Sequence, residues 1–161
     1  MQKRVFVVAF GLLVALAAAK PNAADRRFVP SIAFGNTFEA RGGRLALNKS
    51  PKADLRDYGT HLISDHGHAQ EKLAKIAKRK GLSLPGGLTA ADQKLIAKFD
   101  SLKGDAFNRT YKRAVLEHHR HALMGIEKEI RNGRDPEIVG YAKEMRNMVK
   151  GHIRMLEAVK V

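Results

Sequence analysis

The chain has 161 residues, with 30 Lys or Arg against 16 Asp or Glu, which gives a formal net charge of +14. This length suits one domain with a core of its own. The chain contains no Cys, which excludes disulfide-stapled small domains and thiol chemistry. Only three Tyr and no Trp offer little for stacking on bases, so the positive charge does not favour specific nucleic-acid binding.

Residues 1–24 have the layout of a secretory signal peptide, in which a basic start precedes an apolar run from Val5 to Ala19. That run is shorter than the roughly 20 residues of a spanning helix, and no later segment is long and apolar enough to span. We therefore expect export to the periplasm or outer membrane, cleavage after Ala19 or Ala24, and a mature domain over residues 25–161. A retained N-terminal anchor is the alternative.

Helical signals dominate the rest of the chain, and no strand pattern competes with them. Ser50 and Pro51 supply an N-cap residue and a proline at the first helical position. Gly81 and Gly133 are helix stops, because glycine favours the C-terminal cap. The expected long helices, in chain order, cover residues 30–48, 51–80, 105–132 and 136–159, and a short helix lies between residues 89 and 104.

Connection lengths predict how these helices pack. The connections within the first pair and within the second pair of long helices are only a few residues, so each pair should be antiparallel. The segment from Gly81 to Gly104 is long enough to cross the bundle with its short helix. We therefore expect an all-α fold, a ferritin-like antiparallel four-helix bundle with a short extra helix in the long central crossover.

The stretch THLISDHGHAQEKLAK, from Thr60 to Lys75, carries three histidines. At 100° per residue, His66 falls on the apolar stripe of its helix, whereas His61 and His68 fall on a flank that should face water. Asp65 is placed to pair with either flanking histidine. This pattern makes His66 the candidate for an inward site and the other two bystanders.

The two C-terminal helices each contribute one inward histidine. His119 shares a seam at alternating spacings of three and four residues, and His118 falls beside it at the boundary. His152 is the one basic residue on a predicted stripe that also contains Ile138, Tyr141, Met145, Met148 and Met155. His119 and His152 should lie within about one helical turn of each other in height, whereas Glu39 on the first helix should miss the height of His66 by about 7 to 8 Å unless the helices are staggered.

These residues also carry a resemblance. The segments FVPSIAFGNTFEARGGRLALNKS, LRDYGTHLISDH, FNRTYKRAVLEHH and GHIRMLEA resemble the ferritin-like domain of unknown function 4142, a family of exported bacterial proteins. The resemblance covers nearly all of residues 28–158 and implies a ferritin-like fold without an established activity. Its motif positions include Glu39, Gly43, Ala46, Asp65, His66, Leu73, His119 and His152.

Two functions follow from the inward histidines. In the first, His66, His119 and His152 bind a transition-metal ion such as zinc, copper or iron, with Asp65 or Glu39 as a fourth ligand or an orienting partner. In the second, the histidines form a buried hydrogen-bonded network and the protein is structural. That network would include Asp65 together with Tyr58 and Tyr111.

Other chemistries find less support in the sequence. A di-iron centre needs two Glu-x-x-His helices, and neither Glu117 nor Glu144 has a histidine three residues on. A copper(I) site is conceivable because Met145, Met148 and Met155 share a predicted face with His152, although core packing explains them equally. No nucleophile elbow or phosphate loop is present, so the sequence favours a protein that is not an enzyme.

Net charge also predicts partners. A strongly cationic protein in the cell envelope should attract an anionic membrane or cell-envelope polymer, because the attraction depends on the summed field and not on a fold.

Overall fold

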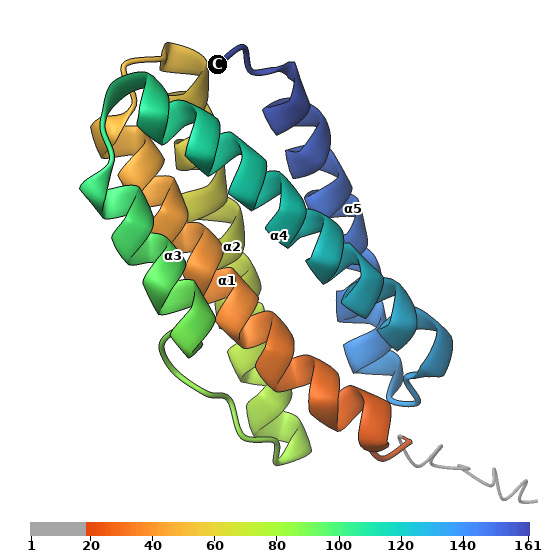
Figure 1. Ribbon diagram of the computed structural model, residues 1–161. Helices are drawn as coiled ribbons and strands as arrows, with labels where there is room; N and C mark the ends of the chain where they lie inside the picture. The colour runs from red at the N-terminus through yellow and green to blue at the C-terminus, as the bar shows by residue number, and fades with distance from the viewer. Residues whose placement is uncertain (1–18) are drawn as a thin grey trace, which may run out of the picture.

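The computed structural model describes residues 19–161, so the predicted leader up to residue 18 lies outside the described residues. Figure 1 shows four long helices packed lengthwise, with a fifth, shorter helix on their outside. None of the helices in the described part of the chain is long and apolar enough to cross a membrane. In chain order the helices are α1 (Ala23–Lys49), α2 (Ala53–Lys80), α3 (Ala90–Ser101), α4 (Gly104–Asn132) and α5 (Pro136–Ala158).

The helices form the expected bundle. α1 and α2 pack as one antiparallel hairpin, α4 and α5 as another, and α1 also contacts α4 while α2 contacts α5 (Figure 1). The segment after α2 runs back along the bundle and carries α3, which lies against α1 and α4. Residues 19–161 contain helices and loops but no strand. The predicted all-α, ferritin-like four-helix bundle with a helix in its central crossover is confirmed.

α1 begins at Ala23, well before the start that we predicted at Pro30. Asn22 caps the helix, since its side chain accepts hydrogen bonds from the backbone N–H groups of Ala24 and Asp25 while the Asp25 carboxylate accepts from the Asn22 N–H. This capping box satisfies donors that the first turn would otherwise leave without partners. Pro30 therefore lies inside the helix, where it removes one backbone hydrogen bond without ending it.

The next two boundaries also differ slightly from those expected. Ser50 ends α1, and its hydroxyl lies 2.8 Å from the side-chain oxygen of Asn108 on α4. α2 consequently begins at Ala53 and not at Pro51. Ser50 thus ends α1 and bonds to α4, and it does not start α2 as the sequence pattern of Ser50 and Pro51 predicts.

A polar layer divides the core into two apolar clusters. One cluster includes Ile32, Leu73, Ile126 and Met145, and the other includes Phe38, Leu62, Tyr111 and Leu156. Each long helix contributes residues to both clusters, and a buried polar residue lies between its two contributions. These residues are Asn36, His66, His119 and His152.

The α1–α2 hairpin depends on a close approach of two glycines. A methyl group at Gly43 would lie 2.7 Å from the carbonyl oxygen of Gly59, and one at Gly59 would lie 2.5 Å from the carbonyl oxygen of Gly43. Both distances are far inside van der Waals contact, and the obstructing atoms belong to backbone. The absence of side chains therefore sets how closely α1 and α2 pack beside the polar layer.

Candidate metal centre

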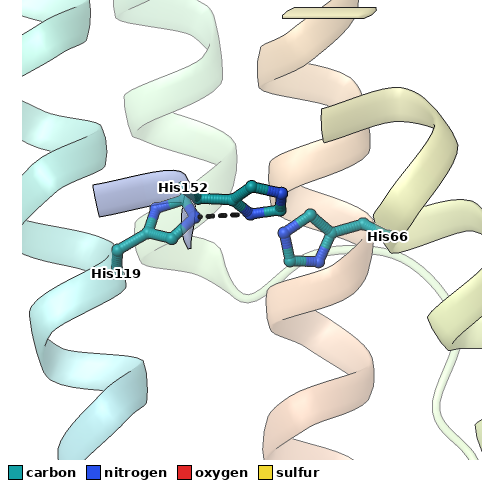
Figure 2. Close-up of side chains that lie close together, drawn as sticks. All are labelled: His66, His119 and His152. Carbon is teal, nitrogen blue, oxygen red and sulfur yellow. Dashed lines mark hydrogen bonds between the residues drawn. The ribbon is translucent and has the colours of Figure 1, made fainter. Parts of the chain in front are cut away.

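Three histidines from three helices meet in the polar layer. His66 comes from α2, His119 from α4 and His152 from α5, and Figure 2 shows their rings turned toward one another. Each is buried, with at most 3% of its surface exposed. One ring nitrogen from each lies within 4.8 Å of those of the other two. The structure therefore brings together the three inward histidines that periodicity predicts.

The hydrogen bond of His66 fixes its tautomer. Its Nδ1 lies 3.0 Å from the side-chain oxygen of Asn36. The Asn36 amide nitrogen donates to Gln70 and to the hydroxyl of Tyr141, so the Asn36 oxygen is left as an acceptor. His66 Nδ1 consequently carries the proton, and its Nε2 is buried without a hydrogen-bond partner.

The other two rings are oriented in the same way. His119 Nδ1 lies 3.0 Å from the carbonyl oxygen of Val115, which can only accept. His152 Nε2 lies 2.9 Å from the Asp65 carboxylate, which also accepts. The remaining nitrogens, Nε2 of His119 and Nδ1 of His152, lie 3.4 Å apart (Figure 2).

Three lone pairs therefore converge with no proton between them while the rings are neutral. Lone pairs that face each other in a buried layer repel, and an unpartnered buried acceptor costs about 1 to 3 kcal/mol. A cation at the centre removes this cost, because each nitrogen then donates its pair to the ion. The arrangement matches metal-binding histidines, whose second ring nitrogen donates to a carbonyl or carboxylate that fixes the ring.

Burial favours the neutral form of two of the rings, those of His66 and His152. It lowers the pKa of His66 to about 3, although the negative charge of Glu39 opposes the shift. Burial also lowers the pKa of His152, against the hydrogen bond to Asp65, which raises it. Neutral imidazole is the form that binds a metal.

The spacing of the donors fits a small transition-metal ion. Nitrogens that bind zinc at 2.0 to 2.1 Å in a tetrahedron lie about 3.3 Å apart. His119 Nε2 and His152 Nδ1, at 3.4 Å, already have this separation. Because the three nitrogens all lie within 4.8 Å of one another, His66 has to approach the other two by at most about 1.5 Å to bind the same ion. Three imidazoles leave a fourth position open to a further ligand.

Glu39 reaches this site from behind His119. One of its oxygens lies 3.3 Å from His119 Nδ1 and 2.7 Å from His118 Nδ1. Burial alone would raise the pKa of Glu39, but its interactions with His119 and His118 lower it to about 2. Burial lowers the pKa of His118, and the hydrogen bond and charge of Glu39 outweigh that effect and raise it. Glu39 and His118 thus form a hydrogen-bonded pair behind His119, in which Glu39 is buried and His118 is 23% exposed.

Glu39 and Asp65 contact residues other than those that the helix pattern predicts. The predicted height mismatch between Glu39 and His66 does not keep Glu39 from the centre, because Glu39 contacts α4 instead. Asp65 pairs with His152, whereas the helix pattern suggested His61 or His68. Those two histidines are exposed, as expected.

The tyrosines of the predicted network take no part in its hydrogen bonds. The Tyr58 and Tyr111 hydroxyls are buried without a partner among the described residues. The Tyr58 ring instead stands edge-on to that of His152, with centroids 6.2 Å apart. Two partners that sequence reasoning missed are Asn36, a polar residue on an apolar face of α1, and His118, which it left at the boundary. Asn36 lies three residues before Glu39, so both lie on one face of α1, and this spacing could have identified Asn36 from the sequence.

The methionine face of α5 differs from the prediction. Met145 is buried, but Met155 is 39% exposed, and Val149 and Leu156 take the inward positions instead. The helix is thus rotated slightly from the predicted stripe. Thioethers therefore do not surround His152 as a copper(I) site would require.

Comparisons with known proteins give a family and a fold. A family model described as Domain of unknown function (DUF4142) matches residues 13–159. Comparison with curated proteins gave no match. The chain is similar to the crystal structure of a DUF305 fragment from Deinococcus radiodurans, with a TM-score of 0.76 and 14% identity over 86% of this chain and 96% of that one. At this identity the likeness shows the helical fold alone.

Proposed function

Because the chain belongs to the family of domain of unknown function 4142, whose description states no activity, we propose from the geometry that it binds one transition-metal ion through His66, His119 and His152. The observation that carries this proposal is the convergence of one ring nitrogen from each of three buried histidines within 4.8 Å of one another. Imidazole donors suit zinc, copper, nickel or iron. The ion would supply positive charge and an open coordination position, and this chain's residues hold and orient the rings.

The surrounding charges support a divalent ion. Asp65 places a carboxylate 2.9 Å from His152, and the Glu39–His118 pair places another beside His119. Carboxylates behind ligating histidines raise the basicity of the rings and hold them in position. Asp65 and Glu39 thus act as orienting partners in this proposal, and neither is needed as a direct ligand.

We predict that the protein, stripped with a chelator and titrated with zinc, copper(II) or iron(II), takes up one ion per chain. Alanine at His66, His119 or His152 should abolish stoichiometric uptake, since two imidazoles alone hold the ion weakly. His61→Ala and His121→Ala are matched controls on exposed positions and should bind as the wild type does. The measurement is metal content per chain after gel filtration.

Thermal melting gives the second readout. An ion at 100 times its Kd stabilises the folded state by about 2.7 kcal/mol, so the wild type should melt at a higher temperature with metal and the three variants should not respond. A wild-type melting temperature that ignores all three metals would contradict the proposal. It would support the alternative function, a structural envelope protein with a buried histidine network.

We further propose that the chain is exported and that the mature protein starts at Lys20. Cleavage after Ala24 would remove Asn22, which caps α1 and whose side chain donates to the carbonyl oxygen of Asn132. Loss of an N-cap costs about 1 kcal/mol, so a protein starting at Asp25 should melt several degrees lower. N-terminal sequencing of the protein from its native envelope checks the site, and an intact Met1 would contradict export.

Association with an anionic membrane or cell-envelope polymer stays a prediction. It rests on the excess of Lys and Arg over Asp and Glu, which remains after cleavage because only two basic residues, Lys3 and Arg4, precede Lys20.

A further inference from the structure

Two openings lie on either side of α2, one lined by a histidine of the centre and the other by a residue that hydrogen-bonds one. A cavity of about 330 Å³ between α2 and α5 is lined by Asp65, whose carboxylate contacts His152. A cavity of about 320 Å³ between α1 and α2 is lined by His66 itself. Both openings are therefore candidate paths for an ion that travels to the buried rings.

The charges that line the α2–α5 opening are acidic on balance. Asp65 and Glu144 contribute two carboxylates, and Lys72 contributes one ammonium, which lies 2.5 Å from Glu144 across the opening. The lining also offers a thioether, Met148, and the imidazole of His68. In a chain with a net charge of +14 this opening is locally negative.

The α1–α2 opening has the opposite charge. Its charged lining residues are Arg41, Arg44 and Glu71, which leave one positive charge in excess. A divalent cation is repelled there and attracted at the α2–α5 opening, and charged clefts change association rates by about 10- to 1,000-fold. The two openings have nearly equal volumes, so they differ in their charge and not in their size.

A third cavity, between α1 and α4, does not compete. It has a volume of about 310 Å³ and is lined by His118 and Asp92. None of its lining residues hydrogen-bonds a histidine of the centre, whereas Asp65 in the α2–α5 opening bonds to His152. The Glu39–His118 pair stands between this cavity and His119.

We infer that the opening between α2 and α5, lined by Asp65, Lys72 and Glu144, is the route by which the metal ion enters and leaves the centre. The inference rests on the proposed function and adds the path to the site. Asp65 links the two ends of this path, since its side chain is 41% exposed while its carboxylate contacts the buried His152. Lys72 limits the attraction of the opening by neutralising Glu144.

The test measures the rate of metal uptake by stopped flow in about 0.1 M salt, where screening over about 10 Å keeps each charge local. Zinc is mixed with chelator-stripped protein, and the wild type is compared with paired variants at the two openings. Glu144→Gln should slow uptake about three- to tenfold, and Lys72→Gln should speed it by a similar factor. Glu71→Gln and Arg41→Gln make the same charge changes at the α1–α2 opening and should alter the rate less than about twofold.

All four variants should still bind one ion per chain at saturation, because none touches the three histidines. Rates that respond to Glu71→Gln and Arg41→Gln would overturn the inference and assign the route to the α1–α2 opening. Rates that respond to no variant would overturn it as well. A wild type that takes up no zinc, copper or iron would instead refute the metal site itself, so the two failures are distinguishable.

Discussion

Gly59→Ala is expected to destabilise the protein by about 2 to 3 kcal/mol, although alanine is the better helix former. The added methyl group would lie 2.5 Å from the carbonyl oxygen of Gly43 and 3.0 Å from the backbone nitrogen of Leu47. Neither atom belongs to a flexible side chain, so α1 and α2 have to move apart. Chemical denaturation followed by circular dichroism measures the loss.

Gly67→Ala is the matched control, since it makes the same change on the same helix. A methyl group there meets nothing within 4 Å, so the gain in helix propensity should stabilise the protein by up to about 1 kcal/mol. Equal effects of the two substitutions would show that the α1–α2 contact is looser than the structure has it.

The bundle was predictable because its signals repeat over many residues. The apolar stripe of α2 contains Leu55, Leu62 and Leu73, and all three are buried as predicted. Helix ends were less predictable, since they depend on single contacts across the bundle. Asn22 starts α1 by capping it and by bonding to Asn132, and the sequence around Pro30 gives no sign of that distant partner.

The centre was predictable in its ligands but not in its partners. His66, His119 and His152 stand on apolar stripes, so periodicity alone identifies them. Which acceptor orients each ring depends on stagger and side-chain reach, which a one-dimensional pattern does not contain. Asp65 reaches across to His152 on α5, and Glu39 reaches His119 on α4.

A second polar cluster lies at the end of the bundle where α1 meets the α4–α5 connection. Asp25 and Glu129 are buried there, with 0% and 2% of their surfaces exposed. The Asp25 carboxylate accepts hydrogen bonds from the backbone N–H groups of Arg134 and Asp135. Burial opposes ionisation of Asp25, but the hydrogen bonds from Glu129 and from the backbone outweigh it and lower the pKa of Asp25.

Glu129 takes the opposite role in this pair. Burial, together with the hydrogen bond to Asp25 and the charge of Asp25, raises the pKa of Glu129 to about 8. At neutral pH it is therefore a neutral acid that donates its proton to the Asp25 carboxylate. Asp25 joins the start of α1 to the α4–α5 connection, and the contact with Glu129 adds its full stabilisation while Glu129 keeps that proton.

The last prediction concerns the pH dependence of stability. A raised pKa means that the folded state keeps a proton that the unfolded state releases, so stability is fully present below pH 4.5 and is lost as the pH rises toward 8. Glu129→Gln mimics the protonated acid and should remove this loss. We expect the variant to match the wild type near pH 4 and to exceed it by a few kcal/mol near pH 8.

Urea denaturation at a series of pH values measures this difference, and histidines that titrate in both proteins cancel from it. Glu127→Gln is the control, because it removes the same charge two residues earlier from a side chain that is 30% exposed and lies 3.6 Å from Lys150. An exposed ion pair of this kind contributes less than about 1 kcal/mol, so the control should show no comparable gain at pH 8. A Glu129→Gln protein that is less stable than the wild type at pH 8 would mean that Glu129 is ionised in the fold and that its charge, not its proton, holds the end of the bundle together.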